Sequence, residues 1–118
     1  MDVKQCYELL KGNYTEAIGR LMSDRLIERL ILKFPQDASM TQLREALAAE
    51  NYEDAFRAAH TLKGVAGNLA FTALHMSASD LTEALRANKQ KPAADLVQKL
   101  EADYTCVINT LEQYQNEK

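Results

Sequence analysis

Residues 51–69 read NYEDAFRAAHTLKGVAGNL, the stretch of the sequence that is most informative about the fold. Asn51 is a favourable N-cap, and the acidic pair Glu53-Asp54 follows in the first turn, where the helix dipole stabilises negative charge. On a helical wheel at roughly 100° per residue, five apolar side chains fall within about 40° of one direction. They are Ala55, Ala59, Leu62, Ala66 and Leu69. We therefore predict an amphipathic helix over residues 51–69, with this face in a core.

Apolar residues at helical spacing also occur on both sides of this stretch, between short polar breaks. Gly12-Asn13 and Pro35 are stop signals, whereas Ser23 and Pro92 suit the first positions of helices. We predict further helices over residues 3–11, 15–22, 23–34, 39–47, 72–87 and 92–114, with a loop over residues 88–91. The expected fold is all-α, an antiparallel four-helix bundle with one or two additional short N-terminal helices. At 118 residues, the chain fits a single domain over residues 1–118.

The composition supports a helical fold and excludes several classes of protein. Glycine (4) and proline (2) are scarce and tryptophan is absent, and no stretch alternates with the period of a strand. A net charge of -3 argues against a nucleic-acid partner. No apolar run approaches the ~18 residues of a membrane span. No signal sequence is visible either, so we expect no direct membrane contact and a cytoplasmic location.

The two cysteines have no spacing typical of metal ligands. Cys6 and Cys106 lie far apart in the sequence and are best interpreted as small apolar residues in a reducing compartment. A bridge between the first and last helices remains an open alternative.

One polar face of the 51–69 helix carries the candidate site. His60 lies roughly 140° from the core direction, Gly67 about 120° and Gly64 about 180°, so all three are expected to face solvent. The two glycines together cost about 2 kcal/mol relative to alanine in a helix. Packing within a monomer does not explain them on a solvated face, so we predict that they give a protein partner room beside His60. A kink in the helix is the structural alternative.

The side chains around His60 suit phosphoryl transfer. Histidine has a reference pKa of about 6.5, so an exposed imidazole is largely neutral and nucleophilic at pH 7. It can attack phosphorus and form a phosphohistidine, which is itself a good phosphoryl donor. Lys63 at i+3 is placed to offset the added negative charge, and Arg57 at i-3 is a second candidate.

Residues 59–69 resemble the signature of histidine-containing phosphotransfer (HPt) domains. The pattern His-x-Leu-Lys-Gly, followed by small residues and Asn-Leu, matches His60, Leu62, Lys63, Gly64 and Asn68-Leu69. The resemblance implies that His60 takes a phosphoryl group from a receiver-domain aspartate and passes it to another. Lys63 would help bind that group, and Gly64 would let the receiver approach.

The resemblance also implies the partners and cofactors. The partners would be the receiver domains of a hybrid sensor kinase and of a response regulator. They would supply Mg²⁺ and the acidic catalytic groups, so this chain would need no cofactor or metal and would act as a monomer. It would be either free-standing or the cytoplasmic C-terminal part of a membrane-bound hybrid kinase. Many family members have glycine where this chain has Ala70, which affects the helix end and partner preference.

The sequence allows three other interpretations. A metal site at His60 and His75 lacks supporting ligand spacing, so His75 is interpreted as a surface or interhelical polar residue. A kinase dimerisation domain would carry a different motif after its histidine, and no nucleotide-binding loop is present. The remaining alternative is a non-catalytic helical scaffold or adaptor, in which His60 is incidental.

Overall fold

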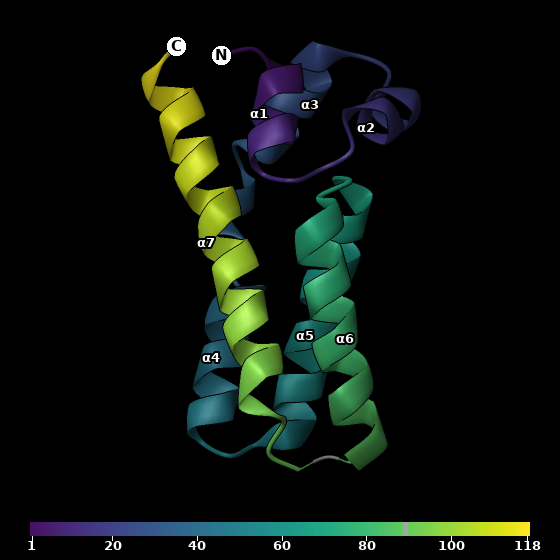
Figure 1. Ribbon diagram of the computed structural model, residues 1–118, viewed down its shortest axis with the longest axis vertical. Helices are drawn as coiled ribbons and strands as arrows, with labels where there is room; N and C mark the ends of the chain where they lie inside the picture. The colour runs from purple at the N-terminus through teal and green to yellow at the C-terminus, as the bar shows by residue number, and fades with distance from the viewer. Residues whose placement is uncertain (89) are drawn as a thin grey trace.

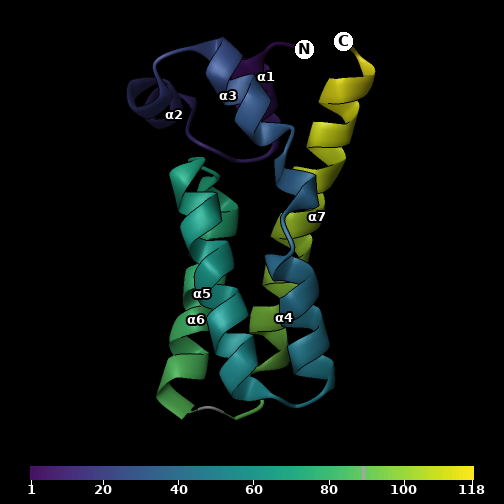
Figure 2. The same cartoon turned by 180° about the vertical axis from the view of Figure 1, so that it is seen from behind.

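The computed structural model describes residues 1–88 and 90–118, and these form helices with no strand. Four helices make the bundle: α4 (Ser39–Ala48), α5 (Tyr52–Asn68), α6 (Thr72–Asn88) and α7 (Ala94–Asn116). Short connections join them, so neighbours in sequence run in opposite directions (Figures 1 and 2). The prediction of an all-α, antiparallel four-helix bundle is confirmed.

Three short helices precede the bundle: α1 (Val3–Leu9), α2 (Tyr14–Leu21) and α3 (Asp24–Ile31). They lie at the end of the bundle where α5 is connected to α6, beside the C-terminal half of α7 (Figure 1). This is one helix more than the one or two expected. The helix predicted over residues 23–34 ends at Ile31, and a 3-10 turn, η1 (Phe34–Gln36), contains Pro35. After this break, α4 packs against α5 and is the fourth helix of the bundle.

A single cluster of buried apolar side chains runs from Val3 to Tyr114. Aromatic rings join the N-terminal helices to the bundle: the ring centroids of Phe34 and Phe71 lie 5.3 Å apart, and those of Tyr7 and Phe71 lie 5.8 Å apart. Aromatic pairs at such separations add to the stabilisation that burial provides. The helices α1–α3 therefore share the core of the bundle.

The ends of several helices differ from the predicted ones. The Ser23 and Asn51 side chains accept capping hydrogen bonds, as expected. The last helix begins at Ala94, two residues after Pro92, and the predicted 88–91 loop includes Lys89, which lies outside the described residues. At the end of α1, Lys11 and not Gly12 adopts positive φ (61°).

Gly12 is required for a different reason from the helix stop that the sequence suggested. A Cβ at this position would lie 2.8 Å from the carbonyl oxygen of Ala70 and 2.8 Å from the ring of Tyr7. The absence of a side chain therefore lets the α1–α2 connection approach the α5–α6 turn closely.

Both cysteines are free. Cys6 is fully buried, and burial raises the pKa of its thiol to about 11. Cys106 is only half-buried, and its Sγ lies 3.4 Å from the carbonyl oxygen of Leu9. The interpretation as a buried apolar residue therefore fits Cys6 better than Cys106.

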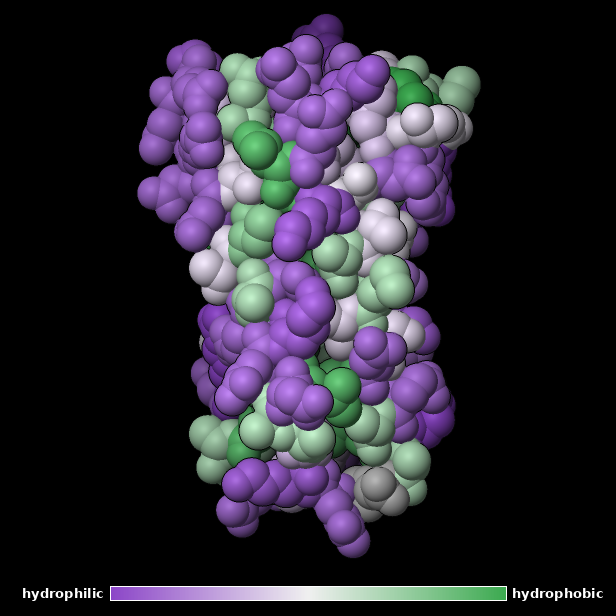
Figure 3. All heavy atoms as spheres, in the orientation of Figure 1, coloured by the Kyte–Doolittle hydropathy of each residue, from purple (hydrophilic) through white to green (hydrophobic). Residues whose placement is uncertain are grey.

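On the face seen in Figure 3, apolar side chains form small patches separated by hydrophilic ones. Among the described helices, none is long and apolar enough to span a bilayer. Grouped histidine, cysteine and acidic side chains that would suit a metal ion are also absent from the described part of the chain.

Candidate functional site

Helix α5 presents His60 to solvent. The Asn51 side chain starts the helix by accepting a hydrogen bond from the backbone N–H of Asp54 at 3.1 Å. Ala55, Ala59 and Leu62 are fully buried, whereas His60 is exposed, as the helical wheel indicated. The small alanine side chains on the buried face let α4 and α6 pack closely against α5.

The imidazole of His60 stacks on a phenylalanine. The rings of Phe56 and His60 are nearly parallel (10°), with centroids 6.1 Å apart. The guanidinium carbon of Arg86, on α6, lies 5.0 Å from the centroid of the same Phe56 ring. Neither residue was among the predicted site residues. The i-4 spacing of Phe56 was a usable signal, but only the packing of α6 on α5 reveals Arg86.

Gly64 and Gly67 have different surroundings. A Cβ built at Gly64 meets nothing within 4 Å, so this position is open, as expected for a partner contact. A Cβ at Gly67 would lie 2.9 Å from Nδ1 of His75. The expectation that nothing within the monomer requires a glycine is therefore wrong for Gly67: the imidazole of His75 fills the space.

His75 is half-buried between α5 and α6 and fixes their contact. Its Nδ1 lies 3.0 Å from the carbonyl oxygen of Lys63. Because a carbonyl only accepts hydrogen bonds, Nδ1 carries the proton and donates it. Of the two positions expected for His75, surface or interhelical, the structure shows the interhelical one, and the hydrogen bond holds the α5 backbone at Lys63. The Lys63 side chain is half-buried, and no ion pair joins it to a described residue.

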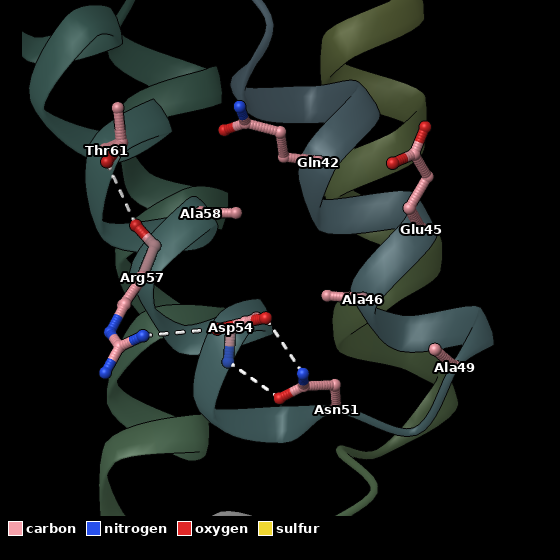
Figure 4. A pocket seen from close by; sticks show the side chains of 9 residues that line it. All are labelled: Gln42, Glu45, Ala46, Ala49, Asn51, Asp54, Arg57, Ala58 and Thr61. Carbon is pink, nitrogen blue, oxygen red and sulfur yellow. Dashed lines mark hydrogen bonds and ion pairs between the residues drawn. The ribbon is translucent and has the colours of Figure 1, made fainter.

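Arg57, the second predicted cation, already has partners. Its guanidinium lies 3.4 Å from a carboxylate oxygen of Glu53 and 3.2 Å from one of Asp54. Figure 4 shows the side chain pointing away from α4, at the edge of a groove of about 420 Å³ between α4 and α5. Two carboxylates therefore partly neutralise its charge before any phosphoryl group arrives.

The carbonyl end of α5 is closed by residues of the N-terminal segment. Arg20 donates to the carbonyl oxygens of Gly67 (2.7 Å) and Asn68 (3.1 Å). The Tyr7 hydroxyl donates to that of Leu69 (2.7 Å), and the Asn13 N–H donates to that of Ala70 (2.8 Å). Carbonyl oxygens in the last turn of a helix lack donors within the helix, so these donors from the N-terminal segment supply their hydrogen bonds.

Ala70 adopts the left-handed conformation (φ 57°) that usually favours glycine. The Ala70 N–H donates to the carbonyl oxygen of Gly67 at 3.1 Å, and the Phe71 N–H donates to that of Ala66 at 2.9 Å. This is the hydrogen-bond pattern of a Schellman motif. The departure noted in the sequence therefore places alanine at a left-handed position that usually favours glycine.

The fold and the site together define a small helical module with an exposed histidine on one helix of its bundle. The Hpt domain family model matches residues 26–117, so the chain belongs to the Hpt domain family. The resemblance of residues 59–69 is thereby confirmed. Hpt domains carry phosphoryl groups in two-component phosphorelays and interact with receiver domains. No curated protein and no solved structure matched the chain.

Proposed function

We propose that His60 is the phosphoacceptor of this Hpt domain and that residues 1–118 act as one relay domain. In this relay, His60 takes the phosphoryl group from the receiver of a hybrid sensor kinase and delivers it to a response regulator. The main support for this proposal is that His60 is exposed beside Gly64, where nothing lies within 4 Å of a built Cβ. A receiver backbone can therefore approach the imidazole closely.

Each of the two transfers, to His60 and from it, is a single displacement at phosphorus. The lone pair of an imidazole nitrogen attacks phosphorus, a nitrogen–phosphorus bond forms, and the bond from phosphorus to the aspartate oxygen breaks. The aspartate leaves as a carboxylate. In the onward step, a second aspartate attacks phosphorus and the imidazole leaves. In this proposal the receivers supply Mg²⁺ and the acidic groups that bind it, and this chain supplies no cofactor.

Lys63 stabilises the phosphorylated state in this proposal. It lies one turn from His60, and its backbone is held by His75, so its ammonium group can reach a phosphoryl group on the imidazole. Lys63→Ala is expected to slow transfer or shorten the lifetime of the phosphohistidine while leaving the melting temperature nearly unchanged. A large drop in melting temperature would instead indicate a structural role. Arg57 stays a prediction of a second, weaker contact.

The test is transfer of radiolabelled phosphoryl groups from a panel of phosphorylated receiver domains. We expect acid-labile, base-stable label on the wild type and none on His60→Gln. The chain has two histidines, so His75→Gln is a matched control and should keep the label. Label that survives in His60→Gln would contradict the assignment. Absence of label on the wild type, together with receiver binding, would favour the scaffold alternative.

The cytoplasmic location and the monomeric state stay predictions. Sedimentation of the purified chain and fractionation of the cells that produce it would test them directly.

A further inference from the structure

The stack of Phe56 on His60 concerns a side chain that would otherwise move freely. An exposed histidine exchanges among staggered rotamers on the nanosecond scale or faster. A nearly parallel ring at 6.1 Å, within the range of attractive offset stacking, favours one of them. Phe56 and His60 are one turn apart on α5, so the helix itself sets their separation.

Arg86 holds the Phe56 ring from the neighbouring helix. Its guanidinium carbon lies 5.0 Å from the ring centroid, within the range of a cation–π contact. Its Nε lies 3.2 Å from a carboxylate oxygen of Glu83, one turn earlier on α6. The guanidinium is therefore held by its own helix while it contacts Phe56. Phe56 is half-buried, which limits its movement further.

From these contacts we propose that Phe56 is a positioning residue for phosphotransfer at His60 and that Arg86 maintains its position. The inference rests on the proposed role of His60 as phosphoacceptor. Phe56 does not touch phosphorus. It holds the imidazole in the orientation in which a ring nitrogen faces the docked receiver. Restricting a nucleophile in this way raises the rate of the bound complex without strengthening the docking itself.

The experiment compares four variants with the wild type. Phe56→Leu removes the ring but keeps an apolar side chain of good helix propensity, and Phe56→Tyr restores the ring. Tyr52→Leu is the matched control, because it removes a half-buried aromatic ring one turn earlier on the same helix. Arg86→Gln tests the supporting contact and remains informative if Phe56→Leu folds poorly.

Two measurements are made on each variant. The first is the transfer rate from a labelled receiver as a function of receiver concentration. In Phe56→Leu the rate at saturation should fall roughly 2- to 10-fold, the range expected for loss of one aromatic pair, while the half-saturating concentration stays unchanged. Phe56→Tyr and Tyr52→Leu should match the wild type, and Arg86→Gln should show a smaller loss.

The second measurement is nuclear magnetic resonance of the free protein, which needs no receiver. Three-bond couplings of His60 should indicate one χ1 rotamer in the wild type and in Phe56→Tyr, and averaging in Phe56→Leu. Averaged couplings in the wild type would overturn the proposal.

The two proposals fail in distinguishable ways. A raised half-saturating concentration with an unchanged maximal rate in Phe56→Leu would assign Phe56 to docking and overturn positioning. The same conclusion follows if Phe56→Leu changes neither the rate nor the couplings. If the wild type accepts no label from any receiver, the role of His60 fails, and the couplings still decide whether Phe56 orders its ring.

Discussion

Replacing Gly64 with alanine should stabilise the domain and slow phosphotransfer at the same time. Gly64 lies in the interior of α5, where glycine costs about 1 kcal/mol relative to alanine. Nothing lies within 4 Å of the added Cβ, so no clash offsets the gain. For 118 residues, an unfolding entropy of about 2.1 cal/mol/K per residue converts this gain into a rise in melting temperature of about 4 °C.

The expected loss of transfer follows from the same open space. The new methyl group lies one turn from His60, on the surface that the receiver must approach. A displacement of about 1 Å between reacting groups can lower a rate by roughly 100-fold, so we expect a loss of about 10- to 100-fold at saturating receiver. Circular dichroism at 222 nm measures the melting temperature, and quenched-flow transfer of radiolabel measures the rate.

Gly19 provides the matched control for Gly64. It lies in α2, at the end of the molecule (Figure 1), and a built Cβ there also meets nothing within 4 Å. Gly19→Ala should therefore stabilise the chain by up to about 1 kcal/mol and leave transfer unchanged. The reasoning is refuted if Gly64→Ala destabilises the domain, or if it transfers as fast as Gly19→Ala.

The remaining predictions concern other parts of the fold. Gly67→Ala should destabilise the chain by about 1–3 kcal/mol through overpacking against His75, and much of this loss should disappear when His75→Ala is present, as a double-mutant cycle of melting curves can show. Ala70→Gly should stabilise by roughly 1 kcal/mol in urea titrations, because alanine pays for the left-handed conformation. Hydrogen bonds from Lys118 and a tyrosine hydroxyl lower the pKa of Glu28. The stabilisation that these hydrogen bonds give the folded state is therefore present above the unfolded pKa of Glu28. It is lost as the pH falls through the lower pKa of the folded state. Glu28→Gln should therefore flatten the acid limb of a plot of stability against pH. An unchanged acid limb would contradict this assignment.

Much of the fold was predictable because local signals agree with the tertiary structure. Asn51, the acidic first turn and the alanine-rich face of residues 55–66 all indicate the helix that forms α5. The position of His60 on its exposed face follows from helical geometry alone. The break at Pro35 was also visible, but the sequence does not show that α4 takes the fourth corner of the bundle. That outcome depends on how α3 packs against α1 and α2, which no local pattern encodes.

The candidate site was only partly predictable for the same reason. On a wheel, Gly64 and Gly67 look alike, since both face away from the core direction of α5. Only the approach of α6 distinguishes them, by placing the His75 ring against Gly67. Arg86 was missed because it reaches Phe56 from a different helix, whereas the pairing of Arg57 with Glu53 is local and was open to inference from the i,i+4 spacing.

The donors at the carbonyl end of α5 matter to anyone who transplants this module. The family match begins at residue 26, yet Tyr7, Asn13 and Arg20 complete the helix that carries His60. A graft cut at residue 26 would keep the whole motif and leave the last turn of that helix prone to fraying. For rewiring a signalling circuit, the portable part is therefore longer than the recognisable one, and a chimera should begin at α1.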